Sequence, residues 1–246
     1  HTADITIDVA DNKTLTYSGA PFSLGAYTLT LTGGGNLASG GLTLNNADSK
    51  LLLNSITVDS VSTTIDNSLG VDVDNDSTIT SLSVANITPV SIASGKTLSG
   101  AITLTAGSVK LNETGTLASS ISMSGGTLDA DNSLTVSGTL TQSGAITIDV
   151  ADTKTLTYSG GNLNVGSHTL SIGGAGTFSN ATGSPLVLDV ADSILNLTDN
   201  GTISGPVKLE SGTLKSTGSP TVSGALTQYG DSTIEIAETK TLTYEG

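Results

Sequence analysis

The chain has 246 residues, enough for one or two ordinary globular domains, yet only 36% are hydrophobic, 3% are aromatic and none is Trp. The formal net charge of −14 argues against a nucleic-acid binder and against attraction to anionic membranes, and we predict neither partner. Because the chain contains no Cys, it forms no disulfide and no thiolate zinc site.

Ser and Thr make up roughly 30% of the chain, far above average usage, Gly contributes 30 residues, and all 8 basic residues are Lys. Large side chains are too few to fill a thick core, but medium aliphatic side chains can fill a narrow one. No apolar run approaches the roughly 18 residues of a membrane-spanning helix, so we expect no membrane insertion. No signal-peptide pattern opens the chain, and we expect any targeting signal to lie outside it or to have been removed.

Apolar and polar residues alternate from the first segment, Ile5–Gly19, onward, for example around Ile102 and around Leu188. Alternation over four to six residues is typical of a strand with one buried face. Turn residues such as Gly33-Gly34 and Gly125-Gly126 separate these runs and tolerate the positive φ angles of tight corners. No segment has the i, i+3, i+4 pattern of an amphipathic helix, so we predict short strands joined by corners.

Long internal repeats accompany this alternation. Ile5–Gly19 recurs at Ile146–Gly160 with one difference, Asn12 against Thr153. A third version closes the chain at Ile234–Gly246. Long repeats of this kind indicate an architecture built from repeated units.

A shorter repeat unit is also visible. Gly126–Gln142 recurs at Gly212–Gln228, and Leu98–Leu111 is echoed directly afterwards at Leu117–Leu128. The spacings between the long repeats divide into units of roughly 20 residues, the length of one solenoid coil.

We therefore predict an all-β, right-handed parallel β-solenoid (β-helix) of roughly 20-residue coils. Right-handedness follows from the crossover rule for parallel strands. We expect residues 1–246 to form one continuous solenoid of roughly 11 to 13 coils, about 55 Å long at about 4.8 Å per coil. We also expect these residues to be a window of a longer repetitive chain. A β-sandwich is the alternative, but the coil-length repeat and the few aromatics favour the solenoid. We expect the core to include Ile5, Ile7, Leu15, Ile102, Leu104, Ile121, Met123, Ile146, Ile148, Leu156 and Leu188.

Units such as SGAITLTAGSVKLNETGTL (Ser99–Leu117) and GGTLDADNSLTVSGTLTQSGAITI (Gly125–Ile148) resemble the repeat regions of large bacterial surface adhesins. Autotransporter passenger domains and filamentous-haemagglutinin-like β-solenoids look similar. The resemblance lies in composition and rhythm over the whole chain, without a signature motif. It implies export to the extracellular cell surface and a role in attachment or spacing.

The sequence predicts no catalytic site and no cofactor. Polysaccharide-cleaving β-helix enzymes, which resemble this chain in fold, cluster carboxylates with Arg, Lys or His. Here Arg is absent and the histidines are His1 and His168, of which His168 replaces Tyr27 of the matching repeat. A surface or strand role for His168 is therefore favoured over catalysis. No G-x-S-x-G motif has a His partner that the spacing would support.

Calcium is not indicated, although one segment is a weak candidate. Asp72, Asp74 and Asp76 resemble the first half of a calcium loop, but Ser77 and Leu82 stand where that loop needs Gly and Glu. Alternation would place the three carboxylates on one solvated strand face. A weak ion site shared between stacked coils is the other interpretation.

Pairs of threonines separated by one residue suggest ice binding, but their spacing along the chain argues against it. The pairs are Thr14/Thr16, Thr28/Thr30, Thr103/Thr105, Thr155/Thr157 and Thr241/Thr243. Flat ranks of outward threonines characterise solenoid ice-binding proteins, but such ranks need one pair per coil, and these pairs are irregularly spaced. The β-propensity of Thr explains them. Several glycosylation sequons, for example those at Asn86, Asn112 and Asn196, are expected by chance in so polar a chain.

We expect a structural or adhesive extracellular protein that forms a rod, stalk or fibre at the microbial cell surface. Its expected partners are neighbouring solenoid segments or identical chains end to end. The alternative is a glycan-binding solenoid module, which would use the few aromatic side chains available: Tyr17, Tyr27, Tyr158, Tyr229, Tyr244, Phe22 and Phe178.

Overall fold

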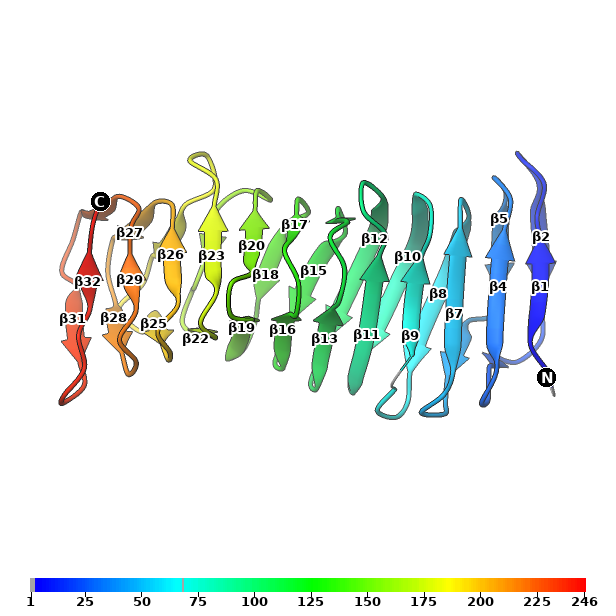
Figure 1. The fold of residues 1–246 in the computed structure, drawn as a ribbon, viewed down its shortest axis with the longest axis horizontal. Helices are drawn as coiled ribbons and strands as arrows, with labels where there is room; N and C mark the ends of the chain where they lie inside the picture. The colour runs from blue at the N-terminus through cyan, green and yellow to red at the C-terminus, as the bar shows by residue number, and fades with distance from the viewer. Residues whose placement is uncertain (1–2, 68) are drawn as a thin grey trace. The chain divides into compact units, whose positions relative to one another are not determined.

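The computed structural model describes residues 3–67 and 69–246, and within these ranges there is no helix (Figure 1). Parallel sheets stack into a β-solenoid of about 11 turns, each of about 21 residues. This confirms the predicted all-β parallel solenoid and its coil length. Strands of successive coils pair in parallel, as β1 (Ile5–Asp8) does with β4 (Thr28–Thr32), which excludes the antiparallel sandwich.

The chain divides into two compact units, His1–Ile121 (unit 1) and Ser122–Gly246 (unit 2). In unit 1 the coils contribute strands to two main sheets, and β4, β7, β9 and β11 of the first sheet lie side by side in Figure 1. The first sheet contains, in spatial order, β1, β4, β7 (Lys50–Asn54), β9 (Gly70–Val73), β11 (Ile87–Ile92) and β13 (Ser108–Leu111). The second contains β2 (Thr14–Tyr17), β5 (Asn36–Ser39), β8 (Thr57–Thr63), β10 (Ser77–Val84), β12 (Thr97–Leu104) and β14 (Thr116–Leu117), with β3 (Phe22–Ser23) and β6 (Leu42–Leu44) beside it.

Unit 2 repeats this arrangement and adds a short third sheet. Its first sheet contains β16 (Thr127–Ala130), β19 (Ile146–Val150), β22 (Thr169–Gly173), β25 (Ile194–Leu197), β28 (Thr213–Ser216) and β31 (Thr233–Ile236). Its second contains β17 (Leu134–Val136), β20 (Thr155–Tyr158), β23 (Thr177–Asn180), β26 (Thr202–Ser204), β29 (Thr221–Val222) and β32 (Thr243–Tyr244). The third contains β21 (Leu163–Asn164), β24 (Leu186–Leu188), β27 (Val207–Leu209) and β30 (Leu226–Gln228). The remaining strands are β15 (Ser120–Met123) and β18 (Leu140–Gln142).

Aliphatic side chains stack in register inside each unit. In unit 1 one such ladder consists of Ile5, Leu29, Leu51, Val71, Val90 and Leu111. In unit 2 the corresponding ladder consists of Ile146, Leu170, Leu195, Leu214 and Ile234. Full burial of one aliphatic side chain contributes roughly 1.5–3 kcal/mol, so the ladders are the main source of stability.

Most of the predicted core is confirmed. The buried members are Ile102, Leu104, Ile121, Met123, Ile146, Ile148, Leu156 and Leu188. The prediction is wrong for Leu15, which is 42% exposed, and Ile5 and Ile7 are only half-buried. These residues lie in β1 and β2, the first strands of their sheets, and a coil of unit 1 covers them from one side only.

A buried serine closes an equivalent corner in each unit. The Ser49 hydroxyl donates to the Gly25 carbonyl at 2.5 Å, and the Ser193 hydroxyl donates to the Gly166 carbonyl at 2.7 Å. Both serines are fully buried. Because an unpaired buried carbonyl costs free energy, these hydroxyls stabilise the contact between neighbouring coils.

The single difference between the two long repeats falls on a residue in the left-handed region. Asn12 has a φ of 58°, and the equivalent Thr153 and Thr239 each have a φ of 64°. Asn adopts this conformation more readily than a β-branched residue such as Thr. Thr at this position therefore adds backbone strain relative to Asn, although the chain turns the same corner with either residue.

We expect Thr153→Asn to raise the free energy of unfolding by about 1 kcal/mol and Asn12→Thr to lower it by about the same amount. Chemical denaturation of both variants, followed by circular dichroism, measures the two shifts. Thr155→Asn is the control and should not raise the free energy, since Thr155 lies in β20 and Asn is a poor strand residue. Shifts of the same sign for the two corner variants would contradict this account.

Candidate functional site

Many of the acidic side chains join neighbouring coils. In unit 1 the backbone N–H groups of Thr28, Gly34, Ile87 and Thr97 donate to Asp4, Asp11, Asp66 and Asp76 at 2.8–3.0 Å. In unit 2 those of Gly166 and Gly174 donate to Asp189 and Asp199 at 2.9 and 3.1 Å. Hydrogen bonds to an ionised acceptor are stronger than neutral ones. These carboxylates thus have a structural role at the corners.

The calcium candidates are not gathered on one strand face, contrary to the alternation argument. Asp72 lies in β9 and pairs with Lys50, with 2.5 Å between the Lys50 Nζ and an Asp72 carboxylate oxygen. Asp74 and Asp76 are exposed in the corner that follows, because β9 ends at Val73. Within residues 3–67 and 69–246, no group of three or more His, Cys, Asp or Glu is placed to hold a metal ion.

Of the two histidines, the structure describes only His168. His1 lies outside the described residues. His168 is half-buried just before β22, where Tyr27 stands before β4 in the other repeat. A Cβ built on Gly166 would lie 3.8 Å from the His168 ring, and one on Gly25 would lie 3.6 Å from the Tyr27 ring. The imidazole therefore occupies the same place as the phenol, over a corner glycine, which supports a packing role.

The aromatic side chains of unit 2 differ widely in burial. In unit 2 Tyr158 and Phe178 are both 1% exposed, and their rings stack with 6.4 Å between centroids and 20° between planes. Tyr229 and Tyr244, also in unit 2, are 67% and 50% exposed. The candidate aromatics for glycan binding are thus split between a buried pair and exposed side chains.

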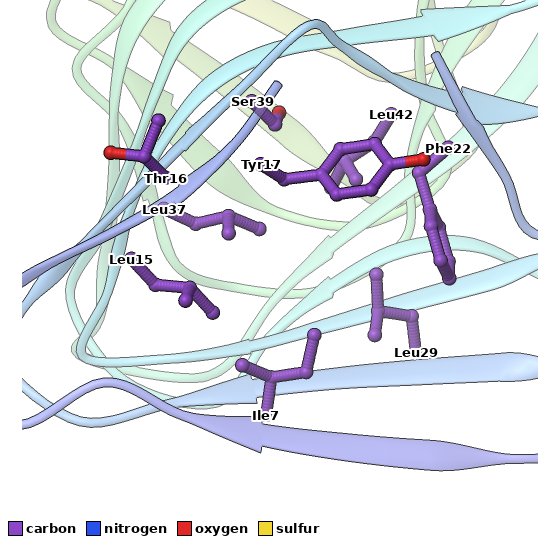
Figure 2. Close-up of a pocket in the computed structure, with 9 residues that line it drawn as sticks. All are labelled: Ile7, Leu15, Thr16, Tyr17, Phe22, Leu29, Leu37, Ser39 and Leu42. Atoms are coloured by element: carbon purple, nitrogen blue, oxygen red, sulfur yellow. The ribbon is translucent and has the colours of Figure 1, made fainter. Parts of the chain in front are cut away.

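Unit 1 holds a small apolar pocket at its first coils (Figure 2). Its volume is about 140 Å³, and its lining residues are Ile7, Leu15, Thr16, Tyr17, Phe22, Leu29, Leu37, Ser39 and Leu42. In Figure 2 the rings of Tyr17 and Phe22 lie on one side and Leu15 and Leu37 on the other. The two rings meet edge to face, with 6.0 Å between centroids and 89° between planes. The lining offers aliphatic and aromatic contacts, so the pocket suits an apolar group.

Tyr17 and Tyr158 are equivalent residues of the long repeat, but their hydroxyls lie in different surroundings. The Leu140 N–H of the preceding coil donates to the Tyr158 hydroxyl at 3.2 Å, and the Leu226 N–H donates to that of Tyr244 at 3.4 Å. At Tyr17 the hydroxyl instead lies beside Gly19, where a Cβ would collide with it. A preceding coil therefore determines how this tyrosine packs.

Burial raises the pKa of the Tyr158 phenol above its ordinary value of 10.0, and the Leu140 hydrogen bond lowers it by less. A raised pKa in the folded state means that stability is intact below about pH 10 and falls as the pH rises further. In an ultraviolet titration we expect a late component that is absent in Tyr158→Phe and after unfolding. Tyr229→Phe, at an exposed position, should retain it. A late component that survives Tyr158→Phe would contradict the assignment.

The structure shows ordered rows of Thr and Ser on one surface of unit 2, which the spacing of threonines in the sequence did not predict. In unit 2 five threonines of successive coils stand in register on the outer face of the second sheet: Thr155, Thr177, Thr202, Thr221 and Thr243. Beside them runs a second rank, Thr135, Thr157, Ser179 and Ser204. Counting residues between pairs missed these ranks because the coils differ in length and because Ser replaces Thr in some of them.

The sequons lie in different surroundings. Thr88, the hydroxyl residue of the Asn86 sequon, is fully buried, and Asn196 accepts a hydrogen bond from the Thr217 hydroxyl at 3.2 Å. Asn112 lies half-buried in the corner after β13, beside exposed Glu113 and Thr114. Among these three examples, only the sequon at Asn112 lies in a corner with an exposed hydroxyl residue.

No family model, no curated protein and no solved structure matches this chain. In the described part of the chain, no helix is long and apolar enough to cross a membrane.

Proposed function

We propose that this chain is a structural and adhesive repeat protein that forms part of a rod, stalk or fibre at the microbial cell surface. The observation that carries the proposal is the stacking of aliphatic ladders in register through successive coils of each unit. An array of this kind gains stability coil by coil and can be lengthened without changing its cross-section. The net charge of −14 supports it by keeping an exposed filament hydrated and soluble.

The proposal also places the protein outside the cell, as the adhesin-like repeats imply. Antibodies raised against the chain should label intact cells of the organism that produces it. An antibody against a cytoplasmic protein of the same cells, which should label only after permeabilisation, is the control. Labelling of this chain that also requires permeabilisation would overturn the surface location.

Its partners in the proposed fibre are neighbouring solenoid segments or identical chains, arranged end to end. The support comes from the first coil of unit 1, where Leu15 and Tyr17 are each 42% exposed beside the apolar pocket. At the equivalent Tyr158 the hydroxyl accepts the Leu140 N–H of the coil before it. A further coil that packed on Tyr17 would cover the pocket and supply the same donor.

A glycan-binding module is the second candidate because the exposed Tyr17 ring and the Phe22 ring flank the pocket. Aromatic rings are the usual platform for the apolar face of a sugar. Both candidates use the same ring, so Tyr17→Ala removes a contact that either partner would need. The two candidates are distinguished by which partner the Tyr17→Ala variant no longer binds, another chain or a saccharide.

If coils associate end to end, sedimentation velocity should show concentration-dependent association of the wild-type chain that Tyr17→Ala weakens. His168→Ala is the control, because the half-buried His168 ring precedes β22, which has β19 and β25 on either side and lies away from the terminal coils; this variant should associate as the wild type does. Two results together would favour the glycan-binding candidate instead. The first is a saccharide on a glycan array that binds the wild-type chain but not Tyr17→Ala, and the second is a wild-type chain that does not self-associate.

A further inference from the structure

The hydroxyl ranks of unit 2 form a regular surface, which we name the hydroxyl face. It comprises one rank of Thr155, Thr177, Thr202, Thr221 and Thr243, and a second rank of Thr135, Thr157, Ser179 and Ser204. Members of a rank are neighbours on adjacent parallel strands, about 4.8 Å apart. The two ranks are two residues apart along each strand, a rise of about 6.6 Å.

The register of the hydroxyl face does not depend on equal coil lengths. The coil from Thr177 to Thr202 is longer than the one before it, and the coil from Thr202 to Thr221 is shorter than both. The differences in length lie in the corners and in the other sheets, so the strands of this sheet stay aligned. The irregular spacing of paired threonines in the sequence is therefore no argument against ranks in space.

The hydroxyl face is also free of charge. None of its six strands, β17, β20, β23, β26, β29 and β32, contains a charged residue. The first sheet of the same unit, by contrast, carries outward Asp129, Asp149, Lys215 and Glu235. In a chain with a net charge of −14, a neutral face over six strands is a distinct surface.

Two features restrict the positions of the side chains on this face: the packed core under the strands and the branched Cβ of threonine. The inward residues of the same strands include Tyr158 and Phe178, which stack on each other and are 1% exposed. Threonine is branched at Cβ and has few χ1 rotamers, so its hydroxyl and methyl groups have restricted positions. Thr155, Thr177 and Thr202 are half-buried and thus present these groups at the surface.

The chemistry of the hydroxyl face selects among partners. Each hydroxyl both donates and accepts hydrogen bonds, as water does, and the methyl groups between them carry no charge. A polysaccharide surface would call for aromatic platforms, but the aromatic rings of β20 and β23 are buried in the core. Tyr244 of β32, although 50% exposed, stands in register with the buried Val222 and not with the threonines. Nucleic acid is disfavoured by the charge of the chain. A neutral, periodic lattice of hydrogen-bond donors and acceptors fits best.

We propose that the hydroxyl face of unit 2 is a contact surface for ice. Its ranks hold a row of water molecules at the spacing of the coils, and these waters join the lattice of the crystal. The corresponding face of unit 1 is interrupted, since Asn36, Ala38 and Asp59 take outward positions in β5 and β8. The proposal concerns this surface alone and does not depend on the role of the chain in a surface fibre.

The test uses the full chain and a pair of bulky substitutions in the centre of the first rank, Thr177→Tyr with Thr202→Tyr. The wild type should shape growing ice crystals, show thermal hysteresis and inhibit recrystallisation, and the double variant should lose all three effects. The matched control, Thr147→Tyr with Ser171→Tyr, changes two half-buried outward neighbours on the first sheet of the same unit and should retain them. Circular dichroism and thermal unfolding establish that both double variants are folded.

Three results would overturn the proposal. The first is a wild-type chain with no effect on ice, and the second is an equal loss of activity in the two folded double variants. The third is binding to crystalline cellulose or chitin that the rank variant abolishes, without any effect on ice, which would assign the face to a polysaccharide.

Discussion

Register between successive coils is the constraint on which the remaining structure depends. Each inward side chain of a strand packs on the inward side chain of the next strand, as Leu29 does on Leu51 and Leu170 on Leu195. Because side chains alternate between faces, a shift of one residue would turn an aliphatic ladder to solvent and bring hydroxyls into the core. The same register that buries the aliphatic ladders also aligns the outward side chains of successive strands. The surface residues therefore form ordered ranks, as the core residues do.

Corners make this register compatible with coils of different length. The longer coil from Thr177 to Thr202 and the shorter coil from Thr202 to Thr221 both return the chain to the same place on the next strand of the sheet. Carboxylates such as Asp76 and buried hydroxyls such as Ser193 satisfy backbone groups at these corners. Several of the acidic residues are therefore explained by contacts between coils, independently of any ligand.

The alternation of apolar residues and the long repeats were sufficient to predict the solenoid, its coil length and the burial of residues such as Ile102 and Leu104. They could not predict that Leu15 is exposed, because its burial depends on a coil that covers it and not on its own strand. Counting along the chain also missed the hydroxyl face, since register is a property of paired strands. The corner hydroxyls were unpredicted for a similar reason: Ser49 and Ser193 look like any other turn serine until the carbonyl of another coil is placed beside them.

Cross-linking within a chain that contains no Cys tests the parallel register most directly. Thr147 and Ser171 face each other on β19 and β22, so cysteines at these positions should have Cα atoms about 4.8 Å apart and form a disulfide under mild oxidation. Cysteines at Thr147 and Thr169, two residues out of register, should have Cα atoms about 8 Å apart and should not. Efficient oxidation of the out-of-register pair, with none of the in-register pair, would contradict the stacked coils.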